Sequence, residues 1–399
     1  MRMGHRVRFA AWVLLACHGV LKADDGTTRA RLESIEAGQA AAASRFERER
    51  QGDSTEAARR AANERLERET RRNLEAAIEL ARTNPEDATS FEALKFVVQN
   101  HQPSLGDMTV RALQLMLDQG DERRPGHASY LFQVALGLWQ YPDAERLLRR
   151  ILDRNPDRAE RAAACYWLAR HLTSQARISR RLRGKPEGQK DFEGHLAAEP
   201  IGRFVQEKDP AALDRKAEEL LERASDEFGD VRLPGSTQTI GEVATGELFA
   251  ARNLNIGQAA PEIVGTDHES KPFKLSETRG KVVVLTFTGS WCGPCVAMYP
   301  LFRELLTIHK GRPFSIVSVD TDTDVQALKK AIDSGKITWR CWWDGGMDGP
   351  IARRWGIASF PRIFVLDPQG VIRFKDVRGD DLKRAVAGLL DVPETVKPR

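Results

Sequence analysis

Two hydrophobic patterns divide the chain. Up to about residue 256, apolar residues recur three or four positions apart among charged ones, which predicts amphipathic helices. From Gly257 onward the period changes, and the run Lys-Val-Val-Val-Leu-Thr-Phe-Thr at residues 281–288 has the length and composition of a buried strand. The sequence therefore predicts an all-α region followed by an α/β unit.

The most highly charged part of the helical region is residues 24–82. It is rich in Arg, Glu and Ala, has almost no Gly, Pro or aromatic residues, and Leu74 and Ile78 keep a helical spacing. We expect a solvent-exposed helical arm with charge pairs such as Glu64 with Arg68. A dimerising coiled coil is the alternative, which we disfavour because the seam is mostly Ala and polar residues.

Residues 83–232 read as a series of helical hairpins. Asn84-Pro85 and Asn155-Pro156 each close one helix and open another, and they lie 71 residues apart, about twice the tetratricopeptide period. Arg124-Pro125 is a third such junction and makes the spacing irregular. The segment loosely resembles a tetratricopeptide-like array, and such stacked helices serve either as a spacer or as a partner-binding surface.

A linker, residues 233–256, carries one short helix at about 241–252 and leads into the α/β unit, residues 257–399. In that unit we expect strands at 281–288, 314–319, 337–343, 362–366 and 371–374, and helices at 294–310, 324–334, 349–355 and 380–390. This order predicts a central mixed sheet with helices on both faces.

Composition and charge exclude several classes of protein. The chain has 399 residues, 41% of them hydrophobic, which is enough for roughly two or three domains with their own cores. The net charge is only +4 and no basic stripe interleaved with aromatic residues occurs, which argues against a nucleic-acid binder. Five Cys cannot staple a chain of this size, and only Cys292 and Cys295 form a CxxC.

The first 23 residues have the pattern of an export signal, because basic residues precede an apolar run from Phe9 to Leu21 that is short for a membrane span. Leu14-Leu15-Ala16-Cys17 resembles a lipobox, with Cys17 as the lipidated residue, whereas Ala23 before Asp24 fits an ordinary cleavage site. An uncleaved segment is the third possibility. We expect an exported protein of the periplasm or cell envelope, where disulfides persist, with membrane attachment only through this segment or its lipid.

The redox chemistry is expected at Trp291-Cys292-Gly293-Pro294-Cys295, between a buried strand and its helix. A helix N-terminus stabilises a thiolate, so we expect Cys292 to be an exposed attacking nucleophile. The two-residue gap brings Cys295 within bonding reach, and it can then resolve a mixed disulfide. Pro294 suits the first helical turn, and Gly293 lets another chain approach.

Segment 257–391 resembles the thioredoxin-fold, redoxin-type thiol:disulfide oxidoreductases of bacterial envelopes, often called TlpA-like. The resemblance rests on the CxxC pentapeptide, on Pro300 in the following helix, on Phe360-Pro361, and on the runs Ile256–Pro261 and Gly280–Val284. It covers about a third of the chain. It implies a thioredoxin-like fold with a cis-proline opposite the CxxC, protein thiols and disulfides as substrates, an envelope electron donor, and no cofactor.

The same resemblance gives Phe360 and Pro361 a role in binding substrate backbone, with Trp291 as an apolar wall. The alternative for Pro361 is an ordinary residue of an edge strand. The chain departs from the family at Thr286, six residues before Cys292, where thioredoxins have a buried Asp. Arg362 follows Pro361, so we also expect an altered partner groove.

Other interpretations of the cysteines are weaker. A zinc site would need two more ligands, and neither a second CxxC nor an HxxxH occurs, so we expect no metal. A peroxiredoxin would have Pro and Thr or Ser where Leu285 and Gly289 stand. We expect Cys165 and Cys341 to be buried, with a third redox thiol as the alternative for Cys341.

The sequence thus predicts an exported thiol:disulfide oxidoreductase that exchanges its dithiol with protein disulfides. The Gly-Pro dipeptide resembles that of thioredoxin, a reductant of about −270 mV, so we slightly prefer a reductase to an oxidase. The rival hypothesis is a helical-array scaffold or binding protein with an accessory redox domain. A partner of the helical array is also expected, and nucleic acid is not.

Overall fold

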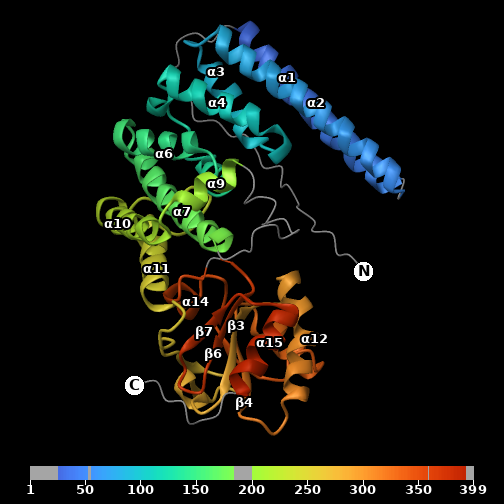
Figure 1. The fold of residues 1–399 in the computed structure, drawn as a ribbon, viewed down its shortest axis with the longest axis vertical. Coiled ribbons are helices and arrows are strands. Elements are labelled where there is room, and N and C mark those ends of the chain that lie inside the picture. Colours follow the sequence, from blue (N-terminus) through green and yellow to red (C-terminus); the bar gives the residue numbers. More distant parts are fainter. Residues whose placement is uncertain (1–25, 53–54, 184–199, 358, 392–399) are drawn as a thin grey trace. The chain divides into compact units, whose positions relative to one another are not determined.

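The computed structural model describes residues 26–52, 55–183, 200–357 and 359–391. The expected export segment with Cys17 lies outside these residues. The chain divides into two compact units, one up to Glu122 and the other from Arg123 onward. Figure 1 shows the helices of the first unit, and the helices and sheet of the second.

The first unit begins with a helical hairpin where one arm was expected. Helices α1 (Gly26–Gly52) and α2 (Glu56–Thr83) pair along their length. Polar contacts hold the seam: Gln39 bonds Thr70 at 3.0 Å, and Arg65 lies 3.4 Å from Glu49. The Ala-rich and polar face that argued against a dimeric coiled coil is therefore covered within the chain itself.

Further helices follow in both units. Their bounds are α3 (Ala88–Gln99), α4 (Gly106–Gln119), α5 (Leu131–Gly137), α6 (Pro142–Arg154), α7 (Arg158–Arg183), α9 (Pro200–Glu207), α10 (Pro210–Phe228) and α11 (Ile240–Asn253). Asn84 ends α2 and Asn155 ends α6, as their Asn-Pro junctions predicted. The long helix α7 packs against α5, α6, α9 and α10, and its Cys165 is fully buried. A capping box between Thr239 and Glu242 begins α11.

The C-terminal part forms a five-stranded mixed sheet in the order β5-β4-β3-β6-β7. The strands are β3 (Val282–Thr288), β4 (Phe314–Asp320), β5 (Arg340–Trp343), β6 (Arg362–Leu366) and β7 (Ile372–Lys375). Strands β3, β4 and β5 are parallel, whereas β6 is antiparallel to both β3 and β7. This is a thioredoxin-like fold, as the sequence predicted.

A small two-stranded hairpin, β1 (Val264–Thr266) and β2 (Pro272–Lys274), was not expected from the sequence. Its Phe273 ring stacks on Trp342 of β5 with centroids 4.3 Å apart, and Phe273 O accepts the indole hydrogen bond at 3.1 Å. Each strand has only three residues, too few to show an alternating pattern.

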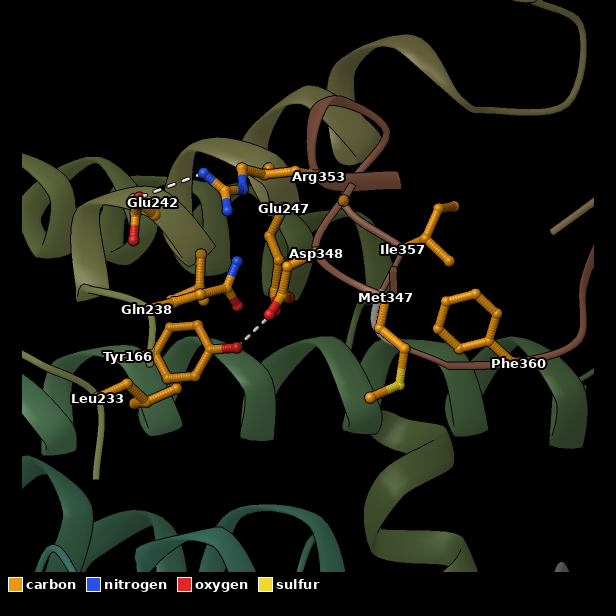
Figure 2. Close-up of a pocket in the computed structure, with 13 residues that line it drawn as sticks. Tyr166, Leu233, Gln238, Glu242, Glu247, Met347, Asp348, Arg353, Ile357 and Phe360 are labelled. Carbon is orange, nitrogen blue, oxygen red and sulfur yellow. Dashed lines mark hydrogen bonds and ion pairs between the residues drawn. The ribbon is translucent and has the colours of Figure 1, made fainter. Parts of the chain in front are cut away.

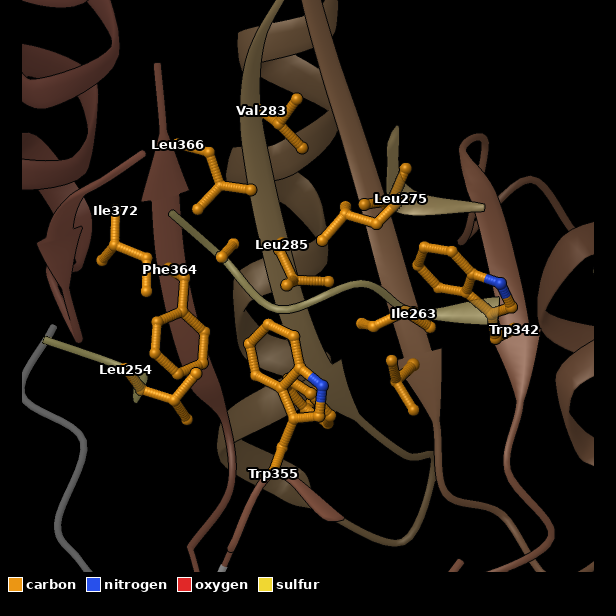
Figure 3. Packing of buried hydrophobic residues seen from close by; sticks show 14 of the residues in the cluster. Leu254, Ile263, Leu275, Val283, Leu285, Trp342, Trp355, Phe364, Leu366 and Ile372 are labelled. Atoms are coloured by element: carbon orange, nitrogen blue, oxygen red, sulfur yellow. The ribbon is translucent and has the colours of Figure 1, made fainter. Parts of the chain in front are cut away.

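The side chains of β3 alternate between two cores. Leu285 and Phe287 enter the core shown in Figure 3, with Trp342, Trp355 and Phe364. Helix α14 (Pro350–Arg354), the β1–β2 hairpin and the end of α11 cover that face. Val282 and Val284 face the opposite way, against helices α12 (Gly293–Ile308), α13 (Val325–Asp333) and α15 (Gly379–Leu390). The central strand is buried on both sides, which explains its continuous apolar run.

Candidate redox site

The CxxC lies where β3 gives way to α12. Strand β3 ends at Thr288, and Cys292 is the N-cap residue of α12, which begins at Gly293. The backbone N–H of Cys295 donates to Cys292 Sγ at 3.2 Å. The two sulfurs form a disulfide of 1.98 Å, with the Cα atoms 5.2 Å apart. Once the disulfide is reduced, the free N–H groups of the helix N-terminus favour a thiolate on Cys292.

Burial of the pair differs from the sequence expectation. Cys292 was expected to be exposed, yet it is 5% exposed and Cys295 only 1%. The surrounding Trp291, Gly293 and Pro294 are exposed. Of the two cysteines, Cys292 is the more exposed.

The Phe360–Pro361 bond is cis, as the resemblance implied. Because β6 runs antiparallel to β3 and pairs Arg362 with Phe287, the proline lies at the end of β3 beside the CxxC. The Phe360 ring packs edge-on against Trp291 with centroids 5.1 Å apart. In the described part of the chain, the backbone N–H and C=O of Phe360 make no hydrogen bond. They are free to pair with an extended peptide.

The loop after β4 anchors the segment that precedes the CxxC. The backbone N–H and the hydroxyl of Ser290 both donate to Asp322, at 2.8–3.1 Å. Trp291 Nε1 donates to Thr321 O at 3.2 Å, and Trp343 Nε1 donates to Asp322 O at 2.7 Å. The sequence analysis missed this role of Asp322 and Trp343. The signal that could have found them is that parallel strands end at the same edge of a sheet.

Strand β4 carries a buried acid, Asp320, on the same sheet face as Thr286 of β3. Thr286 Oγ1 is buried and has no hydrogen-bond partner among the residues that the structure describes. Asp320 pairs in register with Thr288, and its alternation places it on the sheet face that carries α12. Its Oδ1 accepts from Asp322 N at 3.1 Å, whereas Oδ2 is buried without a partner. Burial, reinforced by the charge of Asp322, raises the pKa of Asp320 to about 7.

Two hydroxyl groups lie on the same side of the sheet as this acid. Tyr299, one helical turn after Cys295, places its hydroxyl 3.0 Å from Thr288 Oγ1. Burial and the charge of Asp320 contribute to a raised pKa of the Tyr299 phenol. The described residues therefore include a buried polar layer, Thr288, Tyr299 and Asp320, on the side of the sheet that supports the second cysteine.

The remaining cysteines of the described residues are buried, as expected. Cys165 Sγ donates to Leu220 O at 3.3 Å, and Cys341 Sγ accepts from Ser318 Oγ at 2.9 Å. Burial raises the pKa of both thiols to about 12. At neutral pH neither provides the thiolate needed for exchange.

Within the described part of the chain, no cluster of three or more His, Cys, Asp or Glu side chains is arranged to hold a metal ion. No helix in the same residues combines the length and apolar character needed to cross a bilayer.

A disulfide at this strand-to-helix position of this sheet defines a thioredoxin-fold dithiol protein. Residues 256–375 match the AhpC/TSA family. The thiol-disulfide oxidoreductase ResA of Bacillus thuringiensis subsp. konkukian (strain 97-27) is 31% identical over 130 residues, which are 33% of this chain and 73% of that protein. Through its C-terminal third, the chain belongs to the ResA-like thiol-disulfide oxidoreductases of the thioredoxin fold.

Other relatives cover the same third. ResA of Bacillus subtilis (strain 168) is 25% identical over 134 residues, 33% of this chain and 74% of that protein. Among solved structures, the thioredoxin domain of a thiol-disulfide oxidoreductase from Bacteroides vulgatus is 31% identical and covers 35% of this chain and 100% of that one, with a TM-score of 0.33. A thiol:disulfide interchange protein from Bacteroides sp. is 30% identical, covering 35% and 93%, with a TM-score of 0.32.

Proposed function

We propose that this protein exchanges electrons between the Cys292–Cys295 pair and the cysteines of other proteins outside the cytoplasm. The observation that carries the proposal is the disulfide at the N-terminus of α12, beside the unpaired backbone of Phe360. A thiolate, its resolving partner and a peptide-pairing edge are the parts that thiol–disulfide exchange with a protein requires.

In the reducing direction the reduced Cys292 thiolate attacks one sulfur of a substrate disulfide. A Cys292–substrate disulfide forms, and the other substrate sulfur leaves as a thiolate. Cys295 then loses its proton and attacks Cys292 Sγ, which releases the second substrate thiolate and leaves the Cys292–Cys295 disulfide. Two electrons pass to the substrate, and a donor dithiol in the envelope must return them by the reverse exchange.

Asp320 is our candidate acceptor for the proton that Cys295 gives up, with Tyr299 and Thr288 as the polar groups between them. The support is its position on the α12 face of the sheet and its unpartnered buried oxygen. Asp320→Asn should remove a step near pH 7 from the pH profile of mixed-disulfide resolution. The comparison variant is Asp322→Asn, which changes the neighbouring carboxylate that accepts the hydrogen bonds of Ser290. An unchanged pH profile in Asp320→Asn would show that another group accepts the proton.

The direction of electron flow is proposed from the dipeptide between the cysteines. Gly293-Pro294 is the dipeptide of thioredoxin, which favours a reductase. The export of the protein is proposed from its first 23 residues, which are cleaved before Asp24, lipidated at Cys17 or left uncleaved. Mass spectrometry of the mature N-terminus distinguishes the three outcomes.

Partner trapping tests the exchange reaction. The full-length Cys295→Ser protein should accumulate covalent adducts through Cys292, because the step that releases the substrate is blocked. The double variant Cys292→Ser/Cys295→Ser is the matched control. It should show no covalent adducts on non-reducing electrophoresis. Recovery of the same proteins with the double variant would favour the rival function, a helical-array scaffold with an accessory redox domain.

A further inference from the structure

A pocket lies between the helical region and the redox domain within the second unit. Its volume is ≈ 280 Å³. One side is formed by Tyr166 of α7, Leu233 of the loop before α11 and Val243 of α11. Met347, Ile357 and Phe360 of the redox domain form the other side. Figure 2 shows the Met347 and Phe360 side chains at one end of this pocket, with Tyr166 and Leu233 at the other.

Close packing fixes the two walls relative to each other. Gly246 of α11 lies so near the end of α14 that a Cβ there would be 3.0 Å from Arg353 O and 3.2 Å from Gly356 Cα. Phe249 and Ala250 of α11 pack against the core of the redox domain. The α11 wall is therefore part of the same packed body as the sheet.

Polar contacts hold the helical wall in place. Tyr166 donates its hydroxyl to Glu247 Oε1 at 2.7 Å, the contact drawn dashed in Figure 2, and Arg170 also pairs with Glu247. Arg353 lies 3.5 Å from Glu242 across the two walls. Both glutamates that line the pocket, Glu242 and Glu247, thus have an arginine partner. The rest of the pocket surface is largely apolar.

The pocket continues the surface around the CxxC. Phe360 belongs to both, since it lines the pocket and packs on Trp291. Trp291 is 48% exposed, Trp343 40% and Met347 53%, and these three are among the few large apolar side chains exposed in the described part of the chain. Apolar side chains gathered around a reactive pair mark a surface that another polypeptide covers.

We propose that this pocket receives an apolar side chain of the substrate polypeptide, near in sequence to its reactive cysteine. The inference rests on the proposed function. A substrate strand paired with the Phe360 backbone would place alternate side chains toward the pocket, and side-chain pockets give such pairing its specificity. The helical array, through Tyr166, and the linker, through Leu233 and Val243, then contribute to substrate recognition, so the array is more than a spacer. An acidic side chain is disfavoured, because Asp348, which also lines the pocket, has no ion pair among the described residues.

The test uses the reduced full-length protein and the disulfide-linked dimer of a short neutral peptide with a single cysteine. Leu is placed in turn at each position around the cysteine, and Ala at the same position gives the reference. We expect one or two positions at which Leu raises the second-order rate constant of peptide release about tenfold over Ala, the scale of one apolar group in a hydrophobic pocket.

Two variants locate the effect. Val243→Phe fills the pocket from α11, and at the preferred position the ratio of Leu to Ala rates should fall to about one. Thr245→Phe, exposed on the same helix and not in this pocket, should keep the ratio. Because each ratio compares two peptides on one protein, a partly inactive preparation does not alter it. If Val243→Phe does not fold, Met347→Gln, at an exposed side chain, replaces it with the same expectation.

The outcomes separate this inference from the proposed function. Equal rates for Leu and Ala at every position, or a Leu-to-Ala ratio unchanged in Val243→Phe, would overturn the proposal that the pocket binds a substrate side chain. Exchange itself would still occur in both cases. No release of any peptide by the reduced protein would instead overturn the proposed function.

Discussion

The ring of Phe360 packs edge-on against the indole of Trp291, with 5.1 Å between their centroids. These residues are far apart in the chain, one before the cis-proline and the other before the CxxC. Their contact joins the Phe360 backbone, which we propose pairs with substrate, and the redox pair into one surface.

This contact predicts the effect of truncating the ring. Phe360→Ala should lower the rate constant for a peptide disulfide about tenfold or more, because both the pocket and the Trp291 contact lose apolar area. Phe360→Leu, which keeps much of that area, should retain most of the rate. Stopped-flow tryptophan fluorescence measures both variants. Equal losses in the two would contradict a role for apolar contact.

Asp320 predicts a pH-dependent stability. Its folded pKa is about 7 and its ordinary value is 3.8, so between these values the unfolded chain binds fewer protons than the folded one. The free energy of unfolding should therefore fall as pH rises through this window and level off above it. The shift of about 3 pKa units corresponds to a loss of at most about 4 kcal/mol.

Asp320→Asn should remove most of that loss, so the variant gains stability relative to the wild type on going from pH 4 to pH 8. Denaturant titrations at the two pH values measure it. Burial also raises the pKa of Asp344, which adds a slope of the same sign to both proteins. Only the difference between them reports on Asp320, and a difference that does not change with pH would contradict the raised pKa.

Cys341 should take no part in exchange. Its thiol is fully buried, and its pKa is raised to about 12 by that burial. Cys341→Ser should leave the rate of exchange unchanged at neutral pH, as measured with the peptide disulfides. A slower rate would support the alternative that Cys341 is a third redox thiol.

Gly246 should hold the helical region against the redox domain. A Val at this position would meet backbone atoms of Arg353 and Gly356, and such overpacking costs about 1–3 kcal/mol. Gly246→Val should therefore lower the unfolding midpoint and speed proteolytic cleavage between the two parts. Thr245→Val, exposed on the same helix, is the control. Unchanged cleavage in Gly246→Val would show that the contact does not hold the parts together.

Part of the site could be predicted from short stretches of sequence, because those features depend only on residues close together in the chain. The run at Val282–Thr288 fits only a strand buried on both sides, and the CxxC after it follows the strand-to-helix order. The cis-proline came from a family resemblance that the backbone confirms. These features need no knowledge of which strands are neighbours.

Other features depend on pairings that local sequence does not specify. Asp320 lies on the α12 face only because of the register between β3 and β4. The short strand β2 forms because Phe273 stacks on Trp342, far along the chain. The charged arm is a hairpin in which α1 and α2 pair through contacts such as the hydrogen bond from Gln39 to Thr70. The burial of Cys292 likewise follows from how α12 packs, which a motif does not show.

A redox titration of the full-length protein tests the central claim most directly. The protein is equilibrated in thiol–disulfide buffers of graded potential and quenched with an alkylating agent, and Cys292 and Cys295 are mapped by mass spectrometry. Both cysteines should change state together in one two-electron transition, at about −270 mV if the Gly-Pro dipeptide sets the potential. A pair that stays a disulfide, or stays a dithiol, across the whole range of potentials would contradict the central claim.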